Sequence, residues 1–224
     1  MHDDDIRIEE LLTADETRRA AEVLDEVWQD GSGVSAELLR ALAASGNYVV
    51  GLYDGDLMIG ASAAFFGPPA TRSMHSHITG ISSDYRAAGL GRRLKQHQRD
   101  WAFARDVGHI TWTFDPLIAR NAHFNLMVLG ARVVSHSPHH YGPDADRLLV
   151  SWALTGGRPA SPSPHDVVAS VPIPRDIESI RRDDPAAAQA ERERVRGRFE
   201  QLWAEGLMIT GFRDEAGYLF TRAA

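Results

Sequence analysis

The pattern of residues 75–103 predicts a strand, a glycine-containing loop and a helix that follow one another directly. The loop reads Arg86-Ala87-Ala88-Gly89-Leu90-Gly91-Arg92-Arg93. A helix that begins at such a loop presents unpaired backbone N–H groups to an anion. Gly89 and Gly91 carry no side chain that would keep a phosphate from these donors, and the three arginines add positive charge. The pattern predicts a pyrophosphate-binding site.

Two better-known phosphate motifs do not fit this loop. Leu94 stands where the dinucleotide fingerprint G-x-G-x-x-G requires a third glycine, and no Gly-Lys-Ser/Thr triplet of a P-loop follows. A surface turn with a glycine at the helix start and solvated arginines would explain the same residues, and this alternative stays open.

Composition limits the classes of function. The chain has 224 residues, enough for one large domain or two small ones, and a net charge of −7. The charge argues against a general nucleic-acid or anionic-membrane binder but permits a local basic pocket. The absence of cysteine excludes disulfides, thiolate chemistry and Cys-ligated zinc. With no signal peptide and no long apolar run visible, we expect a cytoplasmic protein.

Apolar periodicity and turn residues predict an alternation of strands and helices. Strands are expected in residues 5–12, 48–53, 57–66, 75–81, 110–114, 131–135 and 148–154. Helices are expected to begin near Thr13 and Ser35, and to occupy residues 94–105 and 121–129.

The chain changes composition after residue 154. Residues 155–166 are rich in Pro and Ser and predict a linker or exposed loop. Residues 167–224 predict a strand, a long helix over 185–205 and a closing hairpin. Because apolar residues such as Phe199 and Phe212 need a partner surface, we expect this extension to pack on the domain formed by residues 1–154. The alternating Arg/Glu run over residues 191–200 predicts a solvated helix face.

The glycine loop fits the pattern Arg/Gln-x-x-Gly-x-Gly/Ala directly after a strand, and so resembles the acyl-CoA loop of the GNAT N-acetyltransferase superfamily. The order of elements over about residues 5–154 is also similar. Shorter stretches, including 112–117, 121–126 and 146–150, resemble a subgroup of predicted GNAT acetyltransferases with a C-terminal segment. The resemblance implies an α/β (α+β) GNAT-like acyl-CoA N-acyltransferase fold, with a mixed central sheet flanked by helices and a C-terminal strand-helix-hairpin extension.

The resemblance also implies acetyl-CoA or another acyl-CoA as co-substrate. In the family the pantetheine arm lies between the fourth and fifth strands, so Ile81 would supply backbone contacts to it. Asn121 stands where the family often has an asparagine that contacts CoA. The pyrophosphate would be held by Arg86, Ala87, Ala88, Gly89, Leu90, Gly91 and Arg92.

Acyl transfer to an amine needs a base and a proton for the departing sulfur. His75 and His77 lie two apart on one strand, so both are expected on the same face, together with Thr79. Either histidine could act as the base, and both could instead be ordinary sheet residues. Many GNAT enzymes carry a tyrosine acid in the helix after strand five, but residues 121–130 contain none. Tyr141 is the nearest substitute along the sequence.

Four residues around the same strand and helix are candidates for acceptor binding: Trp112, Asp115, Asn125 and Arg147. The arginine would suit a carboxylate-bearing acceptor. The structural alternatives are Trp112 as core, Asp115 as a strand terminator and Asp146-Arg147 as a surface pair. Asn121 and Asn125 are expected on one helix face, with a helix N-cap as the alternative role for Asn121.

A metal site is a competing hypothesis. Its ligands would be drawn from His75, His77, His136, His139, His140, and Asp144 or Asp146. No H-E-x-x-H motif occurs, and no metal is expected. We therefore expect an N-acyltransferase that acts on a primary amine of a small molecule, with no nucleic-acid or membrane partner. A non-catalytic acyl-CoA-binding module is the alternative, and a homodimer is left open.

Overall fold

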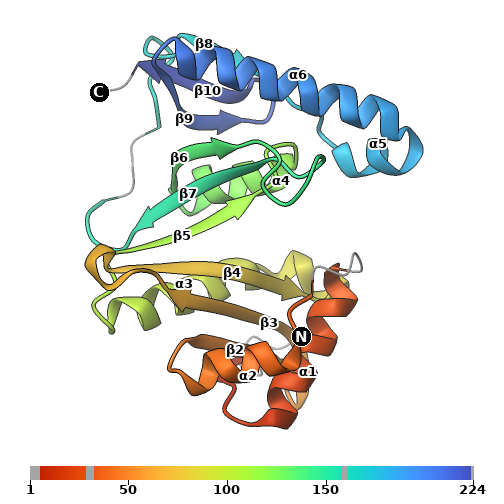
Figure 1. The fold of residues 1–224 in the computed structure, drawn as a ribbon, viewed down its shortest axis with the longest axis vertical. Coiled ribbons are helices and arrows are strands. Elements are labelled where there is room, and N and C mark those ends of the chain that lie inside the picture. The colour runs from red at the N-terminus through yellow and green to blue at the C-terminus, as the bar shows by residue number, and fades with distance from the viewer. Residues whose placement is uncertain (1–5, 29–32, 158–160, 223–224) are drawn as a thin grey trace. The chain divides into compact units, whose positions relative to one another are not determined.

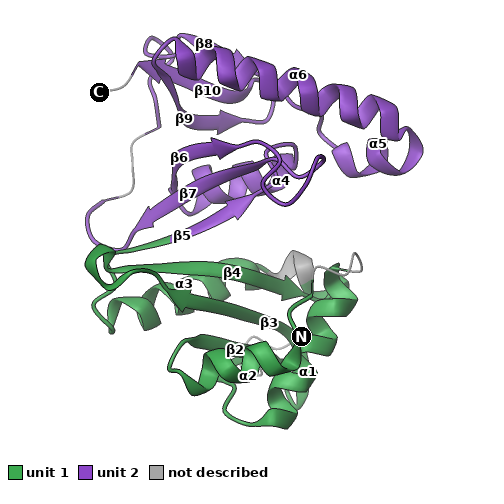
Figure 2. Cartoon of the chain, viewed as in Figure 1, with its two compact units in different colours: residues 1–110 green, residues 111–224 purple. Residues whose placement is uncertain are grey.

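The computed structural model describes residues 6–28, 33–157 and 161–222, except the side chains of residues 86–88. The chain divides into two compact units, residues 1–110 and residues 111–224 (Figure 2).

The first unit is built on four antiparallel strands. These are β1 (Ile6–Glu10), β2 (Tyr48–Asp54), β3 (Leu57–Phe66) and β4 (Ser73–Ile81), which pair in chain order (Figure 1). The turn between β2 and β3 uses Gly55 at φ 56°, a conformation that glycine adopts without strain.

Three α-helices cover this sheet: α1 (Ala14–Trp28), α2 (Ala36–Ala44) and α3 (Leu90–Phe103). The Ser35 side chain caps α2 by accepting a hydrogen bond from the Leu38 N–H. The helices α1 and α2 pack on one face through Leu24 and Leu39, in a cluster that includes Ile78. On the other face, Leu90 at the start of α3 packs in a separate cluster with strand residues. Two 3₁₀ turns, η2 (Pro69–Thr71) and η3 (Ser83–Ala88), flank β4.

The second unit contains β5 (His109–Phe114), β6 (Arg132–Ser137) and β7 (Arg147–Ala153), with β7 between the other two. After β5, a short α4 (Ala119–Ala122) continues as a π-helical segment, η4 (His123–Val128). The sequence predicts one regular α-helix over residues 121–129, whereas the structure contains this widened π-helical turn. Gly130, at φ 76°, ends the segment.

The C-terminal extension forms a second sheet in the same unit. Its strands β8 (Ala169–Val171), β9 (Leu207–Arg213) and β10 (Gly217–Arg222) lie in the order β8-β10-β9, and α6 (Pro185–Ala204) packs against them. An additional helix, α5 (Ile177–Asp183), was not expected from the sequence.

The aromatic residues of the extension make a core of their own. Phe199, Tyr218 and Phe220 are fully buried together, and β9 packs against β6 and η4. The extension therefore shares one compact unit with β5, β6 and β7. The domain boundaries expected at residues 154 and 167 stay a prediction.

Candidate functional site

The glycine loop lies between β4 and α3 in the first unit, as expected. Gly89 adopts φ 72° immediately before α3, a left-handed conformation that favours glycine. Gly91 has no such requirement, and a Cβ atom added there would meet no described protein atom within 4 Å. Because neither backbone strain nor packing demands glycine at position 91, space for a ligand at the helix start is a remaining physical reason for it.

Two arginines follow in the first turn of α3. Arg92 is exposed, while the Arg93 guanidinium donates a hydrogen bond of 2.7 Å to the Ile6 carbonyl. Both line a groove of about 860 Å³ that also includes Gly89 and β1 residues.

The other predicted cofactor residues of this loop divide into two groups. Leu90 is buried and Ile81 packs against the same cluster, so we expect them to offer a ligand mainly backbone atoms. The predicted contacts of the Arg86, Ala87 and Ala88 side chains lie outside the described residues.

A bulge in β4 decides where its histidines point. Ala63 pairs with Ile78, whereas the next residue of β3, Ala64, pairs with Ser76, so His77 is the extra residue. His75 and His77 both lie beside the Phe65 ring, with their own ring centroids 6.4 Å apart. The prediction that the two histidines share a face is confirmed.

Thr79 lies on the opposite face, which corrects the sequence prediction. Its hydroxyl is 2.8 Å from the Ser62 hydroxyl, whereas Ala61 and Ala63 of β3 point to the α1 and α2 side. The bulge inserts one residue, so strict alternation holds on each side of it but not across it.

The His77 ring has the properties required of a base near neutral pH. Much of its side chain is exposed, yet the protein atoms around it partly desolvate the ring and lower its pKa below the ordinary value of 6.5. The imidazole is therefore mostly neutral at pH 7 and able to accept a proton.

A buried amine on the α3 side of β4 was not predicted from the sequence. Lys95, the only lysine in the chain, donates hydrogen bonds to the Ser76 hydroxyl (2.8 Å) and the Gln98 side-chain oxygen (3.0 Å). Desolvation by burial lowers the pKa of Lys95 to about 7. The sequence feature that could have predicted the burial of Lys95 is its position next to Leu94, on the buried face of α3.

In the second unit, two predicted acceptor-binding residues contact each other. The Trp112 indole N–H donates to the Asn125 side-chain oxygen at 3.2 Å, and each residue is only 6% exposed. Both therefore have a structural role, and their role toward a substrate stays a prediction. Asn121 is half-buried and is not the N-cap of α4, because that position belongs to Ile118.

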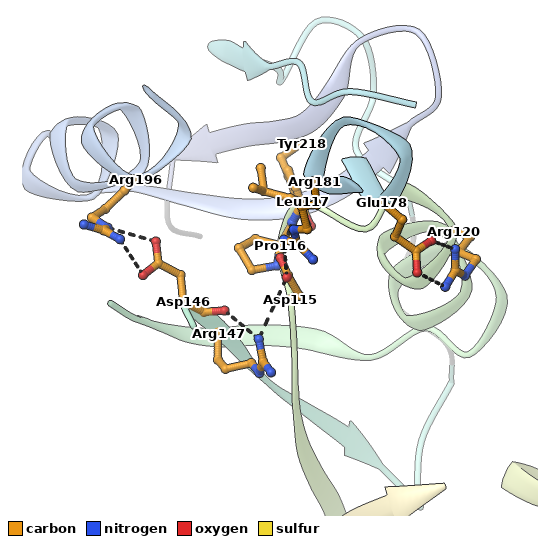
Figure 3. A network of polar contacts seen from close by, with 10 residues as sticks. All are labelled: Asp115, Pro116, Leu117, Arg120, Asp146, Arg147, Glu178, Arg181, Arg196 and Tyr218. Carbon is orange, nitrogen blue, oxygen red and sulfur yellow. Dashed lines mark hydrogen bonds and ion pairs between the residues drawn. The ribbon is translucent and has the colours of Figure 1, made fainter. Parts of the chain in front are cut away.

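Asp115 ends β5 and organises the turn that follows. One of its carboxylate oxygens accepts the Leu117 N–H at 2.9 Å. The other accepts a hydrogen bond of 2.6 Å from Arg181 of α5 and lies 4.0 Å from Arg147 (Figure 3). Asp115 thus lies near Arg147, another predicted acceptor-binding residue, and contacts Arg181, which was not predicted from the sequence; the role of these residues toward an acceptor stays a prediction.

The expected surface pair Asp146-Arg147 is not formed by the two side chains. Asp146 is 4% exposed and accepts two hydrogen bonds from Arg196, at 2.8 and 2.9 Å (Figure 3). It also accepts one from the His139 N–H. Burial opposes ionisation of Asp146, but these donors bring its pKa below the ordinary value. The Arg147 guanidinium instead lies over the ring of Tyr141, which is 61% exposed.

The expected solvated face of α6 is also corrected. Arg192 is only 7% exposed and belongs to a stripe that includes Ala188, Val195 and Phe199. The arginines recur at every second position from 192 to 198, but the helix buries positions three or four apart, so this pattern did not show which arginines face inward.

The comparisons with known proteins agree with this architecture. The family model described as the acetyltransferase (GNAT) family matches residues 7–124, more than half of the chain. The chain belongs to the GNAT family. No curated protein matches the sequence.

Solved structures show the same GNAT fold at low sequence identity. The ribosomal-protein-S18-alanine N-acetyltransferase of Escherichia coli is 15% identical, with a TM-score of 0.58 over 68% of this chain and 96% of that one. The protein yncA of Salmonella typhimurium, solved with acetyl-CoA, is 14% identical, with a TM-score of 0.57 over 71% and 99%. An aminoglycoside 6'-N-acetyltransferase solved with coenzyme A is 17% identical, with a TM-score of 0.55 over 67% and 98%.

Family and fold together confirm the predicted architecture: a mixed α/β protein with a mostly antiparallel central sheet, flanking helices and an added C-terminal sheet. Membership of the GNAT family supports acyl-CoA N-acetyltransferase activity in general. Among the described residues, no three His, Cys, Asp or Glu side chains gather in a way that could hold a metal ion. In the same part of the chain, no helix is both long and apolar enough to cross a membrane.

Proposed function

We propose that this GNAT protein transfers an acyl group, in the simplest case acetyl, from acyl-CoA to a primary amine of a small molecule. The observation that carries the proposal is the helix start at Gly89 and Gly91, where the protein leaves room beside backbone N–H donors. The family match and the neighbours solved with acetyl-CoA and CoA support it.

The residues of the first unit fit such a co-substrate. The N–H groups at the start of α3 would hold the pyrophosphate, aided by Arg92 and by the Arg86 predicted from sequence. Acetyl-CoA, when bound, supplies the acyl group as a thioester. His77 or His75 would take the proton of the amine, and N–H groups of β4 would stabilise negative charge on the carbonyl oxygen. With no cysteine and no G-x-S-x-G motif, direct attack by the amine is the simplest route.

The second unit would contribute the remaining roles. Asn121 is proposed to contact CoA, and the Tyr141 hydroxyl to protonate the departing sulfur. The absence of a tyrosine from residues 121–130 favours one alternative: a GNAT-fold module that binds acyl-CoA without efficient turnover.

Calorimetric titration of acetyl-CoA and CoA tests the proposal. The wild type is expected to bind both, and Gly91→Leu is expected to weaken binding at least about tenfold because a bulky side chain fills the space at the helix start. A helix glycine with the same free surroundings, Gly197 of α6, provides the matched control Gly197→Leu. Both Gly→Leu variants should retain or gain stability, by about 0.5–1 kcal/mol, since leucine favours helix.

Two outcomes would decide against the proposal. Unaltered binding by Gly91→Leu would remove the assigned role of the glycine loop. Binding without acetylation of any amine in a broad panel would favour the non-catalytic module.

A further inference from the structure

The C-terminal extension brings an excess of guanidinium groups to the end of β5. Asp115 lies 2.6 Å from Arg181 and 4.0 Å from Arg147 (Figure 3). Arg192 of α6 is close enough to feel the charges of both Arg181 and Asp115. Two guanidinium groups therefore contact this carboxylate, and a third lies near enough to interact with its charge.

The other buried or ordered carboxylates of this region already have partners. Both oxygens of Asp146 accept from Arg196, and those of Glu178 accept from Arg120 (Figure 3). Asp144 is exposed and acts on Arg192 only through its charge. The excess charge at Asp115 is thus not neutralised by a further hydrogen-bonded carboxylate among the described residues.

Buried donors without acceptors accompany this charge. Among the described residues, the Nε atoms of Arg181 and Arg192 and the Nη1 atom of Arg192 are buried and have no hydrogen-bond partner. Desolvation, followed by repulsion from Arg181, lowers the pKa of Arg192. A guanidinium keeps its proton even so, and a buried cation with unsatisfied donors is costly. A site of this kind gains stability from an added anion.

The surroundings restrict which anion fits. Arg147 and Arg181 keep 26% and 30% of their side chains exposed, so a small anion can reach them from solvent, while Arg192 adds its charge from the interior. Asp115, Asp144 and Asp146 stand close by and would repel a polyanion. A single carboxylate matches the planar N–H edge of a guanidinium and carries only one charge.

We propose that Arg147, Arg181 and Arg192 form a binding site for the carboxylate of the acceptor, so that the acceptor is an amine that also carries a carboxylate. This assignment of the acceptor rests on the proposed acyltransferase function. The carboxylate could belong to a free amino acid or to the C-terminus of a short peptide, which share the same chemistry.

Thermal unfolding with product-like probes tests the site without any turnover. The probes are N-acetylglycine, its neutral amide N-acetylglycinamide, and inorganic phosphate, all at one ionic strength. N-acetylglycine at about ten times its Kd should raise the Tm of the wild type by about 3 °C, and the amide should not. Arg147→Gln and Arg192→Gln should lose the shift. The matched control, Arg198→Gln on another face of α6, should keep it.

Acetylation rates then test the acceptor. We expect ω-amino acids and a free-carboxyl dipeptide to exceed their primary amides at least about tenfold in kcat/KM. The Arg147→Gln variant should lose this preference for the free carboxylate over the amide. Because Arg147 is partly exposed, its variant should fold even if Arg192→Gln does not. A larger Tm shift from phosphate than from N-acetylglycine, or equal shifts from acid and amide, would overturn the carboxylate site.

The two proposals fail in different ways. Efficient acetylation of amides without stabilisation by N-acetylglycine would leave the acyltransferase standing and remove the carboxylate site. Stabilisation by N-acetylglycine with no acetylation of any amine would support the anion site and contradict its assignment to an acceptor.

Discussion

At the scale of single residues, His77 is exposed, and its ring is partly desolvated by the protein atoms around it. The β-bulge at this position determines the face of β4 on which its side chain lies. If it is the base, His77→Gln should lower kcat/KM about 100-fold at pH 7.5, within the usual range for general-base catalysis. The exposed His165, in the loop after β7, gives the control variant His165→Gln, which should leave kcat/KM unchanged.

The pH profile separates this role from a structural one. The folded pKa of His77 is lowered, so the ring becomes available as a base already below pH 6.5. The ratio of wild-type to His77→Gln activity should therefore rise with pH, with a midpoint below about pH 6.5, and then level off, whatever the pKa of the acceptor amine. A ratio that does not vary with pH would assign His77 to structure, and His75→Gln would then be examined in the same way.

Lys95 offers a direct titration, since the chain has no other lysine. With ¹³C-labelled lysine, one ε-methylene NMR signal should titrate near pH 7 in the folded protein. The unfolded amine, with a pKa near 10.5, binds its proton more tightly, so stability should rise with pH between about 7 and 10.5.

The Lys95→Met variant tests how the titration of Lys95 affects the stability of the protein. Between pH 7 and pH 9 the free energy of unfolding of the wild type should rise relative to this variant, by up to about 2.7 kcal/mol for two pH units. A folded-state titration near pH 10.5 would show that the amine reaches water.

At the scale of elements, the pair Asp146–Arg196 joins the loop before β7 to helix α6. Removing one partner of a buried pair leaves the other uncompensated, so Asp146→Asn should lower the free energy of unfolding by about 3 kcal/mol in denaturant titrations at pH 7. The exposed pair Arg182–Asp183 provides the control, and Asp183→Asn should cost less than about 0.5 kcal/mol.

The sign of the pH effect follows from the lowered pKa of Asp146. Its contribution to stability is complete above the unfolded pKa of about 3.8 and is lost as pH falls through the lower folded value. The stability difference between wild type and Asp146→Asn should thus shrink as pH falls below about 3.8, and a difference that stays the same from pH 7 to pH 2 would contradict the ion-pair account.

At the scale of the whole molecule, the extension is expected to be required for the second unit to fold. Phe199, Tyr218 and Phe220 form a buried core, the Tyr218 hydroxyl donates to the Pro116 carbonyl at 2.7 Å, and β9 covers β6 and η4. A chain ending at residue 154 should therefore show reduced solubility and a lower Tm than the full chain. Equal melting and near-UV circular dichroism of the two would instead make the extension an independent domain.

Residue order predicted the strands, most of the helices and the resemblance to the GNAT family, but neither α5 nor the π-helical segment η4. The glycine loop, the hairpin turn at Gly55 and the strand and helix patterns follow from local rules, because backbone conformation and apolar periodicity depend on neighbouring residues. The shared face of His75 and His77 could be predicted in the same way.

Which charged groups contact each other depends on the tertiary fold and could not be predicted from residue order. The bulge at His77 reversed the side of Thr79, and packing placed Lys95 and Arg192 in the interior. Asp115 and Arg181 are 66 residues apart in sequence, and Asp146 and Arg196 are 50 apart. Such partners are selected by long-range packing and desolvation, which residue order alone does not encode in a form that local periodicity can reveal.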